Sequence, residues 1–169
     1  MQTAVSDDQA LARRFPEQIA IAIARDAQGK YNPITLGWTM LTSHDPLLMA
    51  IAVGKQRYSA EAIRHAGAFV LAFPSERQAD EALFHGTKSG REMDKIRAAG
   101  TNTQPATKID GVLFADAVAN FECELVSEHE TGDHIIFVGR VVAAHVNQDA
   151  TLGRLYSLGN ERLGGVRPA

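Results

Sequence analysis

Short apolar runs bounded by turn residues constrain this sequence most. Three such runs span residues 19–23, 47–53 and 68–73, with Asp45-Pro46 before the second and Pro74 after the third. Runs of four to eight apolar residues between such breaks are typical of strands that are covered on both faces. We therefore predict a mainly β fold built around three buried strands.

Turn residues predict how further strands join these three. Asp26 to Lys30 is a turn sequence with Gly29 at the position that favours a positive φ, so residues 32–40 return as the second strand of a hairpin. Residues 130–133 make a second turn, and residues 134–145 follow it as the longest strand. The polar stretch from 101 to 109 predicts a loop.

The strand before the second turn carries an alternating pattern. Phe121, Cys123 and Leu125 alternate with Glu122 and Glu124. A period of two predicts one apolar face and one wet face, with both glutamates in water. We therefore expect Cys123 to point inward.

Helix signals follow the third and fourth expected strands. Residues 59–66 have apolar side chains at helical spacing, with Ser59 as the expected N-cap and Gly67 as the C-terminal stop. Two capping boxes predict two more helices, one over residues 75–86 and one over residues 89–100.

About six strands with a few short helices between them favour a small closed barrel, because hairpin connections and continuous apolar runs suit closure better than an open sheet. A doubly wound parallel fold is the weaker alternative. The 169 residues are 45% apolar, enough for one domain over residues 1–169. Within it, residues 1–14 form a leader, either a short helix or a frayed end, and residues 151–169 form a loosely structured tail.

Charge and composition exclude several classes of function. The formal net charge is -3 and the cations are scattered, so we expect no nucleic-acid partner. No apolar run approaches a membrane span, and the N-terminus has no signal-peptide pattern, so we expect a cytoplasmic protein with no membrane partner. The single Cys123 and six dispersed histidines predict no metal site.

Two clusters of cations and hydroxyls are the first candidates for binding. They are Arg57-Tyr58-Ser59 and Lys88-Ser89-Gly90-Arg91, each at an expected helix start. Free backbone N–H groups, the positive end of a helix dipole and charged donors together suit a phosphate monoester. Either cluster alone is also compatible with ordinary capping and solvated surface charge, so the hypothesis depends on both clusters flanking one strand.

That strand mixes hydroxyls with the only tryptophan. Thr35, Thr39, Thr42 and Ser43 are ordinary strand and turn residues, and a tryptophan such as Trp38 is more often part of a core. Together they also suit a flat ring with an amide-like edge, such as a flavin. Met40 and Leu41 would add apolar cover. His134, after the Gly132-Asp133 turn, is either a strand-end histidine in water or a group beside the bound ligand.

Five pieces of the sequence carry a resemblance in the same order and spacing. They are Asn32-Pro33-Ile34-Thr35-Leu36-Gly37-Trp38-Thr39, Ser43-His44-Asp45-Pro46, Arg57-Tyr58-Ser59, Lys88-Ser89-Gly90-Arg91-Glu92-Met93-Asp94-Lys95 and Gly132-Asp133-His134. Together they resemble the flavin reductase-like family of FMN-binding split barrels, and within it the flavoredoxin-like branch. The similarity extends from Phe15 to about Gly165.

The resemblance implies a six-stranded antiparallel Greek-key split barrel with helical insertions, which acts as a homodimer. It implies FMN as cofactor, with FAD or riboflavin as alternatives, and NAD(P)H as co-substrate. By similarity, His134 would lie near the nicotinamide, and the flavin would be bound by Asn32, Thr35, Trp38, Thr39, Met40, Thr42, Ser43, Arg57, Tyr58, Ser59, Lys88, Ser89 and Arg91.

The activity implied is the transfer of electrons from NAD(P)H through flavin to a second acceptor, which is a flavin, a ferric complex, a quinone or a protein. Two alternatives stay open. One is a flavin-binding electron carrier with no nicotinamide-dependent activity, and the other is a split barrel that has lost flavin and binds another ligand.

Overall fold

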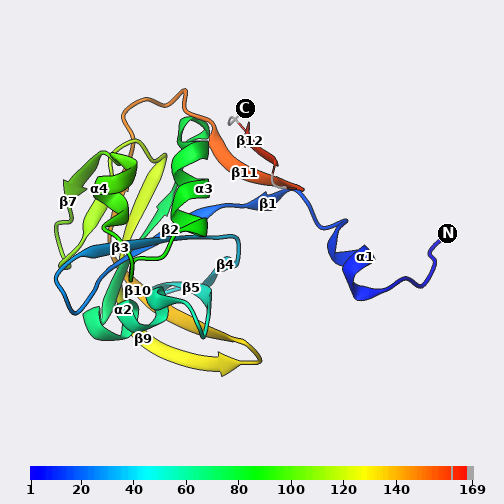
Figure 1. Cartoon of the computed structure of the whole chain (residues 1–169), viewed down its shortest axis with the longest axis horizontal. Coiled ribbons are helices and arrows are strands. Elements are labelled where there is room, and N and C mark those ends of the chain that lie inside the picture. Colours follow the sequence, from blue (N-terminus) through cyan, green and yellow to red (C-terminus); the bar gives the residue numbers. More distant parts are fainter. Residues whose placement is uncertain (161, 167–169) are drawn as a thin grey trace.

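The computed structural model describes residues 1–160 and 162–166, and its main element is an antiparallel seven-stranded sheet (Figure 1). The strand order is β3-β2-β6-β9-β10-β5-β4. The strands are β2 (Ala20–Arg25), β3 (Tyr31–Leu36), β4 (Thr39–His44), β5 (Leu47–Gly54), β6 (Ala68–Phe73), β9 (Ala119–Thr131) and β10 (His134–Val146). The three apolar runs are thus confirmed as strands β2, β5 and β6.

The strand predicted over residues 32–40 is divided in the structure. Its first half, β3, pairs with β2 through the predicted turn, in which Gly29 has a φ of 81°. Its second half, β4, pairs with β5 at the opposite edge of the sheet. Gly37 lies in the crossing, where an added Cβ would come 2.9 Å from the Glu17 side chain. A larger residue at this break would therefore require the Glu17 side chain to move.

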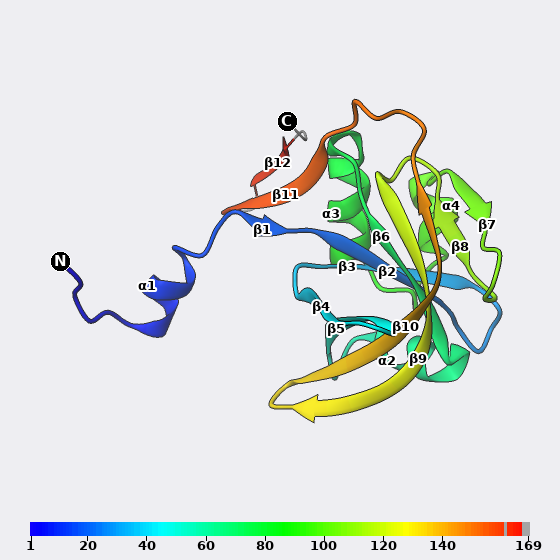
Figure 2. The same ribbon diagram turned by 180° about the vertical axis from the view of Figure 1, so that it is seen from behind.

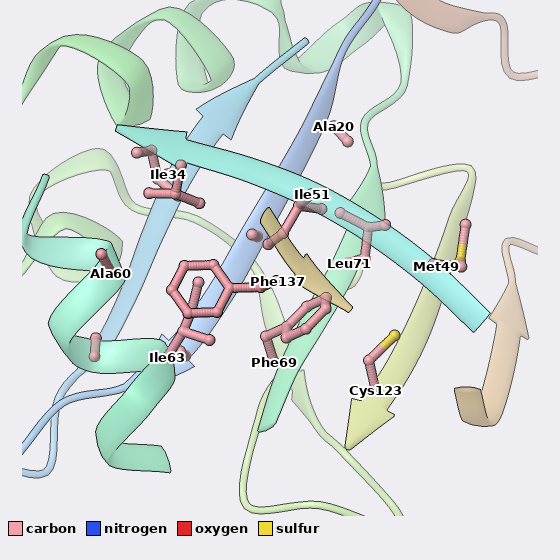
Figure 3. Close-up of a cluster of buried hydrophobic side chains, with 14 of the residues drawn as sticks. Ala20, Ile34, Met49, Ile51, Ala60, Ile63, Phe69, Leu71, Cys123 and Phe137 are labelled. Carbon is pink, nitrogen blue, oxygen red and sulfur yellow. The ribbon is translucent and has the colours of Figure 1, made fainter. Parts of the chain in front are cut away.

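The sheet is not closed by hydrogen bonds. Its edge strands β3 and β4 do not pair with each other, and the sheet has seven strands where six were expected, so the closed barrel is not confirmed. The sheet nevertheless surrounds one core. Figure 3 shows Ile51, Phe69 and Phe137, from three different strands, meeting beside the helix that carries Ile63.

Helix α2 (Tyr58–Ala66) covers this core and stops at Gly67 as predicted, where the backbone is left-handed. Its N-cap is Arg57, two residues earlier than expected, so the prediction of Ser59 as N-cap is wrong. The Ser59 hydroxyl instead accepts a 2.8 Å hydrogen bond from the Asn32 amide on β3. This contact ties the start of α2 to the sheet.

The first capping box lies where it was predicted and the second does not. Gln78 accepts from the Ser75 N–H, and a short 3-10 helix, η1 (Glu76–Gln78), leads into α3 (Ala79–Thr87). After α3 the chain turns, and α4 (Lys95–Ala99) has Asp94 as its N-cap, where the Asp94 side chain accepts a hydrogen bond from the Arg97 N–H. Ser89 is therefore in a turn at the C-terminal end of α3, and not at a helix start.

The wet face predicted for β9 is wrong at Glu122, which is fully buried. Backbone N–H groups of Thr107, Lys108 and Ile109 donate to its carboxylate, and His145 Nε2 lies 2.7 Å from it. Burial alone would raise the pKa of Glu122, but these hydrogen bonds together lower it to about 2. Cys123 is buried as predicted, and burial raises its pKa to about 12.

The remaining strands form two small sheets. β1 (Glu17–Gln18), β11 (Arg154–Gly159) and β12 (Arg162–Val166) form one, so the C-terminal part expected to be loosely structured is mostly strand. Of the predicted tail, residues 161 and 167–169 lie outside the described residues. β7 (Thr103–Pro105) and β8 (Val112–Phe114) form the other, in place of part of the predicted loop.

Helix α1 (Asp7–Leu11) forms within the predicted leader and projects away from the body in both views (Figures 1 and 2). Ser6 caps it and none of its residues is buried. Among the described residues, no helix combines the length and the apolar character needed to cross a membrane.

Candidate functional site

Both predicted cation clusters line the same cavity, which has a volume of about 120 Å³. The N-terminal end of α2 forms one wall and the turn after α3 forms another, with β3 at the base. Of the two clusters, only Arg57-Tyr58-Ser59 lies at a helix N-terminus, because Lys88 is the C-cap of α3. Of the residues that the sequence assigned to flavin, the cavity brings together Asn32, Arg57, Tyr58, Ser59, Lys88, Ser89 and Arg91.

The cavity is strongly cationic. Arg57, Lys88, Arg91 and Lys95 all line it. Within the described part of the chain, the Arg57 and Lys88 side chains have no hydrogen-bond or ion-pair partner. Two unpaired cations beside a helix N-terminus favour an anionic ligand, since such groups supply charged donors with little competition from the protein.

Arg91 is already held in place. Its guanidinium pairs with Glu61, donates to the Gln56 carbonyl oxygen at 3.4 Å, and lies 5.0 Å from the centre of the Tyr58 ring. Tyr58 in turn donates to Gln28 at 2.6 Å. This arrangement fixes one side of the cavity, and it leaves Arg91 less available to a ligand than Arg57 or Lys88.

Lys95 is the main residue that the site assignment missed. It is 3% exposed, and its Nζ donates to the carbonyl oxygens of His85 (3.0 Å) and Lys88 (3.2 Å) at the end of α3. Burial, with a further contribution from Arg57, lowers the pKa of Lys95 to about 8. Lys95 closes the quoted Lys88–Lys95 motif, but only the fold shows that its amine turns back to the cavity.

Two buried polar groups complete the base of the cavity. Asn32 Oδ1 has no hydrogen-bond partner in the structure, although its amide holds Ser59. Gly90 lies directly over it, because a Cβ at that position would come 2.0 Å from Oδ1. His85 bonds Thr101 through Nε2 at 2.9 Å, and burial followed by the charge of Lys95 lowers its pKa to about 4. His85 is therefore neutral at pH 7 and adds no charge.

A second, apolar hollow of about 190 Å³ lies along β4. Trp38, Thr39 and Met40 line it together with residues of β5 and β10. Trp38 is 49% exposed and Met40 is 56% exposed. Exposed large apolar side chains on an edge strand mark a surface that binds a ligand or a partner.

His134 lies between the cavity and the hollow. Its ring centre is 4.6 Å from that of Trp38, and its Nδ1 is 2.7 Å from Asp133 Oδ1. The contact with His134 holds the pKa of Asp133 below its ordinary value. A Cβ on Gly54 would lie 3.5 Å from Arg57 and 3.8 Å from His134, so His134 lies next to the cationic wall as well as the tryptophan.

The other hydroxyls of the predicted strand are used within the protein or lie farther along it. Thr35 donates to the Ala82 carbonyl oxygen at 2.6 Å, and Thr39 donates to that of Ala50 at 2.9 Å. Thr42 and Ser43 lie toward the Asp45-Pro46 end of β4 and line neither the cavity nor the hollow.

Comparisons with known proteins show the family of this chain. The model of the flavin reductase like domain matches residues 12–161. An uncharacterised protein of Aeropyrum pernix is 32% identical over 89% of this chain and 57% of its own length. An NADH-dependent FMN reductase, AsuE2, of Streptomyces nodosus subsp. asukaensis is 32% identical over 69% of this chain and 62% of its own length. The chain thus spans about three fifths of these relatives.

Solved structures share the whole fold. An FMN-binding protein from Thermus thermophilus, with bound p-hydroxybenzaldehyde, superposes with a TM-score of 0.86 at 25% identity, covering 100% of this chain and 98% of that one. The flavoredoxin of Desulfovibrio vulgaris (Miyazaki F) superposes with a TM-score of 0.85 at 19% identity, over 100% and 95% of the two chains, and shows the fold alone. The resemblance seen in the sequence is confirmed: the chain belongs to the flavin reductase-like domain family.

Proposed function

We propose that this protein is an FMN-binding oxidoreductase that passes electrons from NAD(P)H through bound flavin to a second acceptor. The observation that carries the proposal is the cationic cavity, which holds two unpaired cations, together with an apolar hollow whose Trp38 contacts His134 near Arg57. The Streptomyces relative, an NADH-dependent FMN reductase by name, and the Thermus FMN-binding protein support it.

The cavity fits the phosphate of FMN. A phosphate monoester carries close to two negative charges at pH 7, and Arg57 and Lys88 offer two cations without internal partners. The α2 N-terminus adds backbone donors. The unpartnered, buried Asn32 Oδ1 is an acceptor that suits a hydroxyl of the sugar-like chain next to the phosphate.

The hollow fits the ring. Trp38 and Met40 provide apolar area for one face of a flat heterocycle, and Thr39 and Ala50 contribute strand backbone along its edge. The hydroxyls of Thr35 and Thr39 already donate inside the protein, so we assign them to shaping the strand. Thr42 and Ser43 would reach the flavin only near the far end of β4.

When bound, FMN would supply a ring that accepts a hydride and releases electrons singly or in pairs. The residues of this chain would hold the phosphate, orient the ring and leave one face open. His134, fixed by Asp133, would position the nicotinamide without taking or giving a proton. Acceptors consistent with an open face are a free flavin, a ferric complex, a quinone or a protein.

A homodimer would complete the site. Trp38, Met40 and Leu41 are exposed along β4, an edge strand of the main sheet. A second copy packed there would cover both the apolar side chains and the bound ring. We also propose that the protein is located in the cytoplasm.

The test is purification followed by a visible spectrum and anaerobic addition of each nicotinamide. A yellow protein that oxidises NADH or NADPH supports the proposal. A yellow protein inert to both nicotinamides would instead be an electron carrier. A colourless protein that binds no added FMN would be a ligand-binding barrel that has lost flavin, and the proposal would fail.

A further inference from the structure

A third hollow lies where β4, β5 and the ends of β6 and β9 meet strand β11. Its volume is about 500 Å³, within the range of small-molecule sites. Apolar side chains dominate its lining, among them Leu41, Met49, Phe73 and Phe121. Its polar side chains are Gln18, Thr39, His44 and Arg154.

Arg154 is held rigidly at this hollow. Its guanidinium lies 4.0 Å from the centre of the Phe73 ring and 5.4 Å from that of Tyr156. Its Nη2 donates to Gln18 Oε1 at 2.9 Å, and the Gln18 amide donates to the Thr39 carbonyl oxygen. Stacking and a hydrogen bond together fix the plane of the guanidinium.

No carboxylate of the described residues balances the charge of Arg154. Among residues 1–160 and 162–166, no carboxylate forms an ion pair with it. Its Nε is buried and has no hydrogen-bond acceptor. A buried donor without an acceptor is unfavourable, and a guanidinium matches a carboxylate better than other acceptors because both are planar and form paired hydrogen bonds.

The lining is complementary to one class of ligand. Asp and Glu are absent from the described lining, so an anion would meet no like charge there. The aromatic pair Phe73 and Phe121, with ring centres 5.8 Å apart, offers edges and faces to a hydrocarbon group.

We propose that this hollow binds a small apolar monocarboxylate, with the carboxylate on Arg154 and the hydrocarbon part against Phe73, Phe121 and Met49. Thr39 and Met40 line both this hollow and the one assigned to the flavin ring. The bound acid would therefore lie beside the flavin and control access to it. That second statement depends on the proposed function, whereas the binding itself does not.

The binding test uses the full chain freed of flavin by dialysis. Calorimetric titration with 3-phenylpropanoate is compared with 3-phenylpropanamide, which has the same shape without charge, and with acetate, which lacks the ring. The acid should bind at least about tenfold more tightly than the amide or acetate. The amide loses the charged hydrogen bonds to Arg154, and acetate loses the buried apolar ring. Equal binding of acid and amide, or no binding of the acid at 10 mM (about the weakest affinity that such a site needs), would overturn the proposal.

Variants locate the site. Arg154→Gln should lower the affinity for 3-phenylpropanoate about tenfold or more. The affinity of Arg154→Lys should lie between those of Arg154→Gln and the wild type, because lysine keeps the charge but lacks the planar guanidinium. Arg140→Gln is the matched control, since Arg140 is exposed and paired with Glu124 outside the hollow. Unchanged binding in Arg154→Gln would overturn the assignment. If that variant does not fold, the acid and amide comparison on the wild type still decides.

A parallel titration with FMN separates the two proposals. Binding of the acid without binding of FMN would remove the proposed function and keep this site. Binding of FMN, with equal binding of the acid and the amide, would remove this site and leave the proposed function standing.

Discussion

The cationic cavity and the apolar hollow differ in how completely one chain builds them. The cavity has walls from α2, β3 and the turn after α3, and Asn32, Ser59 and Lys95 fix those walls by hydrogen bonds. The hollow is a patch on an edge strand, with Trp38 and Met40 about half exposed. Under the proposed function, this difference predicts that a single chain is enough to bind the phosphate, whereas the ring site would stay open until a partner or a ligand covers it.

The largest expected effect is the loss of FMN affinity when the two unpaired cations of the cavity are removed. Replacing Arg57 and Lys88 together with alanine should weaken FMN binding by at least about a hundredfold, since each charged contact contributes roughly 1.5 to 3 kcal/mol. Riboflavin, which lacks the phosphate, should bind as it does to the wild type. Fluorescence titration measures both affinities.

Arg140→Ala is the control for a general loss of positive charge, because Arg140 lines neither region. An equal loss for FMN and riboflavin in the double variant would mean that the cavity does not bind the phosphate.

Trp38→Ala addresses the other region. We expect a loss of about tenfold that is the same for FMN and riboflavin, because the ring loses its aromatic neighbour while the phosphate contacts stay. If Trp38→Ala lowers the affinity for FMN but not for riboflavin, Trp38 belongs to the phosphate site, and the proposed division between the two regions is wrong.

The pH dependence of FMN binding is expected to depend on Lys95. In the flavin-free chain the pKa of Lys95 is about 8, and a bound phosphate beside it would raise that value. Binding then takes up a proton above pH 8, so FMN affinity should fall by about tenfold as pH rises from 8 to 10. Lys95→Met should bind FMN more weakly at pH 7 and lose this fall, while riboflavin affinity should be flat in both proteins.

The same shift has a consequence for stability. The folded chain holds Lys95 less protonated than the unfolded chain between pH 8 and its ordinary pKa of 10.5. The unfolded state binds more protons in that window, so the Lys95 contribution to the free energy of unfolding should rise with pH there. Comparing denaturant unfolding of wild type and Lys95→Met at pH 7.5 and 10 isolates this contribution. A constant difference between the two proteins would contradict it.

The smallest effect on flavin affinity is expected at the junction of the two regions. His134→Ala should leave FMN affinity within about threefold, since no charged contact to the phosphate is removed. Reduction by NADH or NADPH should nevertheless slow, which stopped-flow absorbance at the flavin band measures. Reduction at the wild-type rate would show that His134 has no part in nicotinamide binding.

Local signals in the sequence predicted much of this fold. The apolar runs of β2, β5 and β6 and the glycines at positions 29 and 67 act through their own residues and near neighbours, and they lie where the pattern placed them. The two cation clusters were correctly expected near each other. Whether they and the other assigned residues bind flavin stays a prediction.

The failures come from contacts distant in sequence. Glu122 is buried because the backbone of residues 107–109 folds over it, which an alternating pattern does not indicate. The strand over residues 32–40 divides because the chain crosses from one sheet edge to the other at Gly37. Lys95 reaches the cavity only because α4 is capped by Asp94 rather than by Ser89.

The most direct measurement of the central claim is the ratio of riboflavin to FMN dissociation constants for the wild-type chain at pH 7. If the cationic cavity binds the phosphate, FMN should bind at least about a hundredfold more tightly than riboflavin. Equal affinities would contradict the claim that Arg57 and Lys88 form one phosphate site.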